Sequence, residues 1–310
     1  MDKLRHIFRM VSYSAARVPL SLSKRRAALR NYFSRDWHFN RKNRRDAAKL
    51  ELPAARVETG ATSVSDVDDY RQIVEAAVQD NQVFELFRSH PNYYPILEHV
   101  SQAQGLSYLQ VLRQRSNIPA DWAITCRSVN DLGSPQKYSY PGLKRVSPTV
   151  LRYLKVYSDL ELLFGPLQGL RCIEIGIGFG GQAAILDLLG KVGEFQLYDL
   201  PAVLELGKKF LEDSQIAAPA FFFDGTMVPV ARPADLLVSN YAFSELTRKL
   251  QLVYLERVIA KAARGYITWN SLSPDGLQPE EILARIPRSR VIAEDPKTHP
   301  DNLVIVWGSD

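Results

Sequence analysis

Residues 171–182 read RCIEIGIGFGGQ, an apolar run followed by four glycines among the next six residues. The apolar run predicts a buried strand, and the residues from Gln182 onward have the pattern of a helix. Glycines at such a junction let the backbone turn sharply and approach a ligand without a Cβ in the way. Because strand, glycine loop and helix follow one another in the required order, this stretch predicts a nucleotide-type cofactor site.

Strands and helices alternate from Leu170 to the end of the sequence, which predicts a mostly parallel sheet with helices on both faces. The predicted strands are Arg171–Ile175, Glu194–Asp199, Ala220–Phe223, Asp235–Ser239, Tyr266–Trp269, Arg290–Ala293 and Leu303–Trp307. The predicted helices are Gln182–Leu189, Ala202–Asp213, Glu245–Ala263 and Pro279–Arg285. The link between the last two strands is too short for a helical crossover, so we expect that pair to be antiparallel.

The glycine loop is compatible with two kinds of cofactor. Gly176, Gly178 and Gly181 satisfy G-x-G-x-x-G, the pattern of nicotinamide and flavin enzymes. Glu174, however, is an acid near the end of a buried strand, where dinucleotide folds usually keep an apolar residue and methyltransferases usually place an acid. We therefore expect an α/β fold with a Rossmann-like class I methyltransferase sheet, an antiparallel last strand and S-adenosylmethionine as cofactor. A NAD(P)-dependent oxidoreductase acting on a sugar nucleotide is the alternative.

Polar residues end the next three predicted strands. Asp199 lies 23 residues after Gly176, a spacing at which an acid can accept hydrogen bonds from ribose hydroxyls, although it also stands where a helix N-cap belongs. Asp224 ends the third strand, where such folds reach the adenine amino group, but Asp-Gly is equally a common turn pair. The fourth strand leads into three residues expected to flank the methionine part of the cofactor: Ser239, Asn240 and Tyr241.

Five segments resemble the sugar O-methyltransferases of bacterial polysaccharide and glycosylated-metabolite pathways. They are HPNYYPILEHVSQAQGLSYL (90–109), VSPTVLRYLKVYSDLELLFG (146–165), CIEIGIGFGGQ (172–182), YDLPAVLEL (198–206) and DLLVSNYAFSEL (235–246). The step Asp199-Leu200-Pro201 is also similar to O-methyltransferases that act on phenols. The resemblance implies methyl transfer to a hydroxyl, with a sugar or glycan as the acceptor. It implies cofactor binding by Glu174, Gly176, Gly178, Gly180, Gly181, Gln182 and Asp199, with Leu200 beside them.

Transfer to a hydroxyl calls for a group that takes its proton. Glu245 follows the fourth strand closely and is one candidate, although the helix dipole also favours an acid there. His299, in the loop between the last two strands, is the other candidate and could equally be a solvated loop residue. No cluster of His, Asp and Glu has metal-ligand spacing, so we expect catalysis without a metal.

Aromatic residues could offer flat surfaces to a sugar ring or serve only in packing. The candidates are Tyr138, Tyr140, Tyr241 and Trp269. The first two lie in residues 130–148, a stretch rich in proline and glycine that predicts a loop with both tyrosines exposed.

The basic character of the chain is confined to its start. Residues 1–50 contain 14 Lys and Arg against 3 Asp and Glu, whereas the remainder contains 25 against 31. Leu4, Ile7, Phe8 and Val11 share one helical face flanked by basic residues, which favours contact of residues 1–50 with an anionic membrane surface. A nucleic-acid-binding module is the second alternative, which the acidic remainder disfavours.

We expect a basic leader and linker over residues 1–66, a helical cap over 67–144 and the cofactor-binding methyltransferase domain over 145–310. The sequence contains neither an apolar run long enough to span a membrane nor a secretory signal, and Cys126 and Cys172 form no CxxC pair. These features predict a cytoplasmic protein, with the inner membrane face as its second location if the leader binds lipid.

Overall fold

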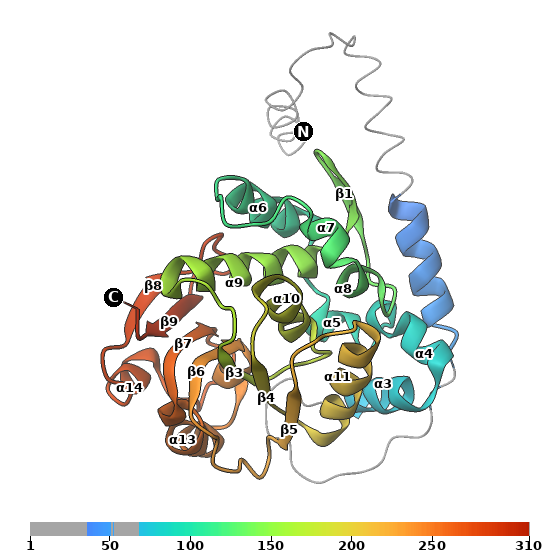
Figure 1. Ribbon diagram of the computed structural model, residues 1–310. Helices are drawn as coiled ribbons and strands as arrows, with labels where there is room; N and C mark the ends of the chain where they lie inside the picture. The colour runs from blue at the N-terminus through green and yellow to red at the C-terminus, as the bar shows by residue number, and fades with distance from the viewer. Residues whose placement is uncertain (1–35, 51, 53–67, 310) are drawn as a thin grey trace.

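A mixed seven-stranded sheet forms the centre of the computed structural model, which describes residues 36–50, 52 and 68–309. Its strands are β3 (Arg171–Ile175), β4 (Glu194–Asp199), β5 (Ala220–Asp224), β6 (Ala234–Asn240), β7 (Ala262–Trp269), β8 (Arg290–Ala293) and β9 (Leu303–Trp307). They lie in the order β5-β4-β3-β6-β7-β9-β8, as Figure 1 shows. All seven strands predicted from the sequence are therefore present, and β7 begins four residues earlier than expected.

The direction of the strands agrees with the predicted fold class. Strands β5, β4, β3, β6 and β7 are parallel neighbours, whereas β9 runs antiparallel to both β7 and β8. Numbered within the sheet, the order is 3-2-1-4-5-7-6, the arrangement of the Rossmann-like class I methyltransferase fold. The order reverses between β3 and β6, and it is beyond the carboxyl ends of strands at such a switch point that open sheets bind ligands.

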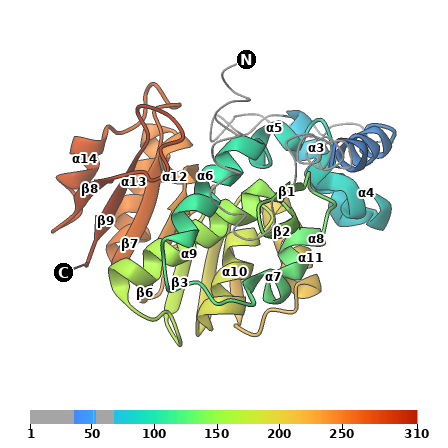
Figure 2. The same cartoon turned by 90° about the horizontal axis from the view of Figure 1, so that it is seen from above.

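Helices cover both faces of the sheet and build a cap at its carboxyl edge. The cap contains α3 (Asp68–Gln79), α4 (Asn81–Leu86), η1 (Phe87–Ser89), α5 (Tyr94–Leu97), α6 (Gln102–Arg113), α7 (Trp122–Thr125) and α8 (Arg127–Asp131). The helices that follow are α9 (Pro148–Phe164), α10 (Gly181–Gly190), α11 (Pro201–Asp213), α12 (Ala242–Glu245), α13 (Arg248–Arg257), η2 (Ile259–Lys261) and α14 (Pro279–Leu283). Figures 1 and 2 both place α3 and α4 at the end of the molecule opposite β8 and β9.

Alternate residues of the strands face two different hydrophobic cores, as the two-residue period of a strand requires. On β6, Val238 faces a core that includes side chains of α9, α10 and α11, whereas Leu237 faces a core with side chains of α13 and α14. The first core also contains Ile73 of α3 and Tyr108 of α6. The cap and one face of the sheet thus share a single apolar interior.

Helix α9 connects the cap to the sheet. Every residue from Pro148 to Leu160 is buried, including the charged residues Arg152, Lys155 and Asp159. It packs against α6 on one side and α10 on the other. The charged residues lie three and four positions apart on one face, which is buried with ion pairs of Asp159 to Lys155 and Arg115, so polarity in this sequence does not mark a solvent-facing side.

Two predicted elements are wrong. The helix expected over Glu245–Ala263 is divided among α12, α13 and η2, because Leu246 and Thr247 are extended, with ψ of 155° and 148°. The amide of Gln251 donates to the carbonyl of Phe243 over 3.0 Å and so satisfies the broken helix end. The last residues of the predicted helix, including Ala262, belong to β7, where they pair with β6.

The loop expected over residues 130–148 contains a hairpin instead, formed by β1 (Tyr138–Tyr140) and β2 (Leu143–Val146). Tyr138 is half-buried and Tyr140 only 1 % exposed, so the predicted exposure of these two rings is wrong. The cause is non-local, because a helix over residues 36–47 lies against the hairpin. Asp36 of that helix accepts from the backbone N–H of Ser139 over 2.7 Å, and the Asn40 side chain exchanges two 2.9 Å hydrogen bonds with the Lys137 backbone.

Part of the predicted leader therefore docks on the hairpin. The predicted apolar face at Leu4, Ile7, Phe8 and Val11 lies outside the described residues. Within residues 36–50, 52 and 68–309, no helix is both long and apolar enough to cross a bilayer.

Candidate functional site

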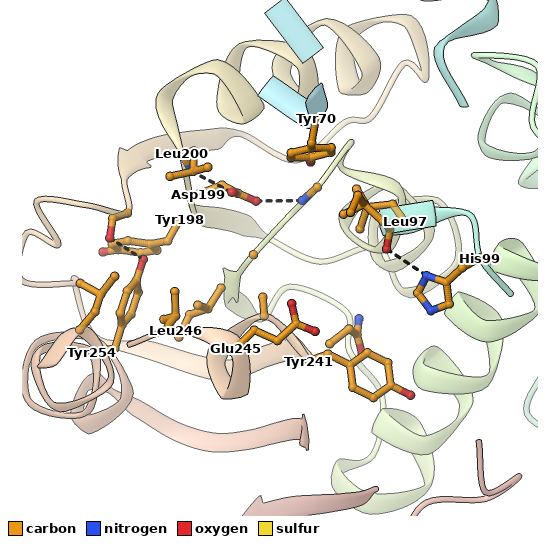
Figure 3. Close-up of a pocket in the computed structure, with 18 of the residues that line it drawn as sticks. Tyr70, Leu97, His99, Tyr198, Asp199, Leu200, Tyr241, Glu245, Leu246 and Tyr254 are labelled. Carbon is orange, nitrogen blue, oxygen red and sulfur yellow. Dashed lines mark hydrogen bonds between the residues drawn. The ribbon is translucent and has the colours of Figure 1, made fainter. Parts of the chain in front are cut away.

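A pocket of about 140 Å³ opens at the carboxyl ends of β3, β4 and β6. Asp199 and Tyr241 contribute to its sheet wall, and Tyr70 and His99 contribute to its cap wall. Figure 3 shows Leu200 toward one end of this pocket and His99 and Tyr241 toward the other. The location agrees with the switch-point rule for ligand sites in open α/β sheets.

The glycine loop forms the floor of the pocket through Gly176 and Gly178, whose φ angles are 77° and 54°. A Cβ added to Gly176 would lie 1.9 Å from Cβ of Ala242, and one on Gly178 would lie 2.8 Å from Cδ1 of Leu97. Both positions thus need glycine for conformation and for space. Protein atoms, and not only a ligand, approach the loop closely.

The other two predicted glycines lie deeper. Gly180 precedes α10 with a left-handed φ of 86°, and Gly181 is the first residue of that helix. Neither is among the described residues that line the pocket. Their place in the structure is the turn from loop to helix.

Asp199 holds the loop and the end of β4 together. Its carboxylate accepts from the backbone N–H of Gly178 over 3.0 Å and from that of Leu200 over 2.8 Å. Its own carbonyl accepts from the N–H of Gly225 over 2.7 Å. The N-cap of α11 is Leu200, so the alternative that Asp199 caps this helix is wrong. Asp199 lies one residue too early and directs its carboxylate to the pocket wall, as Figure 3 shows.

Glu174 is 3 % exposed, on β3 between two neighbouring strands. Burial raises the pKa of the Glu174 carboxyl well above its usual value, and the negative charge of Asp199 raises it further. A hydrogen bond from the Ala183 N–H acts in the opposite direction and lowers this pKa. Its Oε2 has no hydrogen-bond partner among the residues that the structure describes. Glu174 does not itself line the pocket, whereas the next two residues, Ile175 and Gly176, do. The unmatched acceptor thus belongs to the residue directly before the lining of the pocket.

The end of β6 supplies one pocket residue and its supports. Asn240 lines the pocket and donates to Oε1 of Gln182 over 3.3 Å, and Gln182 donates to the carbonyl of Tyr153 over 3.3 Å. Ser239 is fully buried, donates to the carbonyl of Ile175 over 2.9 Å and is not part of the described lining. Gln182 therefore positions the Asn240 side chain, and Ser239 fixes the backbone of Ile175, through these hydrogen bonds.

Tyr241 lines the pocket in an unusual conformation, with φ of 67°. Its N–H donates to the carbonyl of Thr268 over 2.9 Å, and its hydroxyl donates to Glu294. The same hydroxyl lies 3.3 Å from Oγ1 of Thr298. A left-handed backbone at a non-glycine residue costs free energy and persists where the surroundings fix it, which is typical of functional sites.

Asp224 occupies the turn that its alternative interpretation predicts. Its Oδ1 accepts from the N–H and the hydroxyl of Thr226 over 2.8 Å and 2.7 Å. Its neighbour Gly225 lines the pocket, and Asp224 is not among the described lining residues.

The structure separates the two predicted bases. Glu245 lines the pocket, where its carboxylate accepts from Nδ2 of Asn270 over 2.9 Å. The side chain of His299 is 61 % exposed, lies 3.7 Å from Asp301 and is outside the described lining.

The cap provides pocket residues that the sequence did not point to. They are Tyr70, Ile96, Leu97 and His99, together with Arg152 from α9. Nδ1 of His99 lies 3.0 Å from the carbonyl of Ile96, as Figure 3 shows. His99 is exposed at the pocket mouth, yet the protein around its ring and, next, the charge of Arg152 lower its pKa to about 4.

Of the four aromatic residues proposed for a sugar ring, Tyr241 lines the pocket. Trp269 is 6 % exposed at the end of β7, and Tyr138 and Tyr140 belong to the hairpin; none of these three is in the described lining. Over the ranges that the structure describes, no group of three or more His, Cys, Asp and Glu could hold a metal ion.

No family model matches the sequence, and no curated protein does either. Solved structures resemble it at low identity. An S-adenosylmethionine-dependent methyltransferase from Clostridium acetobutylicum is 9% identical, with 51% of this chain and 90% of that chain covered and a TM-score of 0.39. A SAM-dependent methyltransferase from Aquifex aeolicus is 19% identical, with 51% and 96% covered and a TM-score of 0.35.

The methyltransferase domain of bacterial CtHen1-CN is similar at 12% identity, with 50% of this chain and 96% of that chain covered and a TM-score of 0.39. What the pocket can do follows from its own residues.

Proposed function

We propose that the pocket binds S-adenosylmethionine and that the protein transfers its methyl group to a hydroxyl of an acceptor. The observation that carries this proposal is the carboxylate of Asp199, held at the end of β4 by the N–H groups of Gly178 and Leu200. A carboxylate in this position can accept hydrogen bonds from ribose hydroxyls. It stands at the switch point of a sheet whose order is that of class I methyltransferases.

The residues present fit this cofactor. Leu246, Leu250 and Tyr254 line the pocket together with Asp199 and suit a flat purine base. Glu174 keeps an unmatched buried oxygen next to Ile175, which lines the pocket. When bound, S-adenosylmethionine supplies a methyl group that is activated by its positive sulfonium.

The same loop motif occurs in NAD(P)-dependent oxidoreductases, but the rest of the sheet disfavours that alternative. The dinucleotide fold has the parallel order 3-2-1-4-5-6. Here β9 lies between β7 and β8 and runs antiparallel to both. This hairpin edge supports the methyltransferase proposal.

His99 is the pocket residue best suited to take the acceptor's proton. Its Nδ1 lies close to the carbonyl of Ile96, and if Nδ1 carries the proton, Nε2 keeps a lone pair. The lowered pKa keeps the ring neutral at pH 7, the form that a general base requires. Glu245 remains a second candidate because it lines the same pocket, with one oxygen engaged by Asn270.

The acceptor class rests on the resemblance to sugar O-methyltransferases. A sugar hydroxyl is a weak nucleophile at neutral pH, so positioning and a base are what the protein has to provide. The ring of Tyr241, held through its hydroxyl by Glu294, offers a fixed surface at the same end of the pocket as His99.

Calorimetry with S-adenosylhomocysteine and with NADH tests the proposed cofactor. We expect binding of the first with a Kd in the micromolar range, about 8 kcal/mol, and no measurable binding of the second. Binding of NADH alone would favour the oxidoreductase. A transfer assay with methyl-labelled cofactor over glycan and glycolipid extracts then tests the acceptor.

A further inference from the structure

Arg152 is a buried cation in the wall of the pocket. Only 7 % of the residue is exposed, and its guanidinium carbon lies 5.3 Å from the ring centre of Tyr153 and 6.0 Å from that of Tyr241. Its Nε is buried with no hydrogen-bond partner among the described residues. The side chain thus faces a ligand pocket with part of its donor capacity unused.

The acids near Arg152 are already engaged by other groups. Asp159 is 2.6 Å from Nζ of Lys155 and 2.7 Å from Nη1 of Arg115, and it also accepts from the hydroxyl of Tyr266. Within residues 36–50, 52 and 68–309, no Asp or Glu forms an ion pair with Arg152.

Glu294 is a further acid close to Arg152, since both residues line one small cavity. It accepts from the hydroxyl of Tyr241, and its Oε2 accepts from the N–H of Thr298 over 2.8 Å. These hydrogen-bond partners are neutral, and within the described residues Glu294 forms no ion pair with Arg152.

A buried guanidinium without a counterion costs several kcal/mol of solvation free energy, unless an anion completes its surroundings. Its planar fork of donors matches the two oxygens of a carboxylate or phosphate. The aromatic rings beside it support the cation without neutralising it.

A second cavity, of only about 10 Å³, shares Arg152 with the pocket and is also lined by Glu294. Arg152, Asn240 and Tyr241 line both cavities, and Tyr108 and Lys155 line the second. Arg152 also acts electrostatically on His99, the proposed base. The charge therefore stands at the His99 end of the pocket, away from Leu200.

We propose that Arg152 binds a carboxylate or phosphate group carried by the methyl acceptor, so that the acceptor is an anionic molecule such as a sugar acid or a sugar phosphate. This inference rests on the proposed methyl transfer. It assigns the His99 end of the pocket to the acceptor. An anion there would also offset the effect of Arg152 on His99 and make the ring a stronger base.

The Nε–H group of Arg152 can report the anion directly by NMR of protein labelled with [15N]arginine. The signal is assigned by its loss in Arg152→Lys. S-adenosylhomocysteine is added first, followed by the acidic or the neutral glycan fraction of the source cell, separated on an anion exchanger. We expect the cofactor product to leave the signal in place and the acidic fraction to shift it.

Transfer rates provide the second measurement. Arg152→Met should lower kcat/KM for the acidic fraction by about 10- to 100-fold, the effect of one charge-assisted hydrogen bond. It should change the Kd of S-adenosylhomocysteine by less than about 3-fold, because a substitution at a site that does not interact with the cofactor has little effect on cofactor affinity. Arg127→Met, at an arginine whose side chain is 81% exposed, is the matched control and should behave as the unchanged protein does.

Three results would overturn the proposal. The first is a shift of the Nε–H signal by S-adenosylhomocysteine itself. The second is transfer of the labelled methyl group to the neutral glycan fraction alone. The third is an Nε–H signal that neither glycan fraction shifts. The first result would assign the anion to the cofactor. Failure to bind S-adenosylhomocysteine at all would instead contradict the proposed function, and calorimetry detects that separately.

Discussion

The two walls of the pocket differ in how far along the chain their residues come from. The sheet wall is built from Gly176, Gly178 and Asp199, which lie within a single strand–loop–helix–strand unit. The cap wall is built from Tyr70 and His99, which precede the loop by about 75 to 105 residues of sequence. The glycine-loop part of the sheet wall is thus set by local structure, whereas tertiary packing brings in the cap wall and the residues after β6, such as Tyr241. We expect substitutions in the sheet wall to change cofactor binding and those in the cap wall to change transfer.

The largest expected effect is on the cap wall. His99→Gln should lower methyl transfer by about 10²- to 10⁴-fold, the usual contribution of a general base, and leave S-adenosylhomocysteine binding unchanged. Because the pKa of His99 is about 4, the unchanged protein should lose kcat/KM only as the pH falls through about 4. The measurements are single-turnover transfer and a pH–rate profile.

Two further variants serve as comparisons for His99. Glu245→Gln tests the other candidate base in the pocket. His299→Ala tests the exposed loop residue, and we expect this variant to keep the methyl-transfer rate of the unchanged protein. A near-normal rate for His99→Gln with a large loss in Glu245→Gln would reassign the base to the sheet wall.

The sheet wall is tested by Asp199→Ala. Loss of two charge-assisted hydrogen bonds should weaken binding of S-adenosylhomocysteine by about 2–4 kcal/mol, or roughly 30- to 1,000-fold. Asp224→Ala is the control, since its carboxylate accepts from Thr226 in a turn. Calorimetry that gave both variants the affinity of the unchanged protein would remove Asp199 from the site.

The close packing beneath the sheet wall is tested by Gly176→Ala. The added methyl would meet Cβ of Ala242 at 1.9 Å, at a position with positive φ. Overpacking of this kind costs about 1–3 kcal/mol of unfolding free energy. Adding Ala242→Gly should recover part of the loss by removing the opposing methyl. Urea denaturation of both variants measures this, and no recovery would assign the loss to backbone conformation instead.

The smallest effect on the pocket is expected from deleting residues 1–35, which leaves Asp36 and its contact with the hairpin intact. Neither wall should change, so S-adenosylhomocysteine affinity should stay the same. The predicted membrane contact should weaken, because basic residues near an anionic leaflet contribute up to about 1 kcal/mol each. Sedimentation with vesicles containing phosphatidylserine tests this, and equal binding of both proteins would contradict the membrane prediction.

The difference between the two walls also explains how much the sequence could predict. The positions of the strands, the antiparallel edge and the place of Asp199 at the end of β4 follow from periodicity and spacing within residues 170–310, whereas the strand order comes from the structure. The buried position of helix α9 did not follow, because residues 148–160 are buried on all sides, including charged residues that the sequence suggests should face solvent. Without α9, nothing in the sequence pattern pointed to Arg152 as a pocket residue.

The errors have the same origin. The hairpin at 138–146 depends on hydrogen bonds from residues about a hundred positions earlier, such as Asn40. The predicted helix over 245–263 ended early because Gln251 satisfied carbonyl groups that would otherwise continue it, and because Ala262 pairs with β6. In each case a contact between distant residues overrode a local preference.

The shared core of cap and sheet has a consequence for how such a protein could acquire new acceptors. Ile73 of α3 and Tyr108 of α6 pack in the same interior as Val238 of β6. The cap is therefore not a separable module, and exchanging it between relatives would expose the apolar surfaces of α9 and α11 on which α6 and α3 pack. New specificity is more accessible through single substitutions at the pocket mouth, such as at Leu97 or His99, than through recombination of modules.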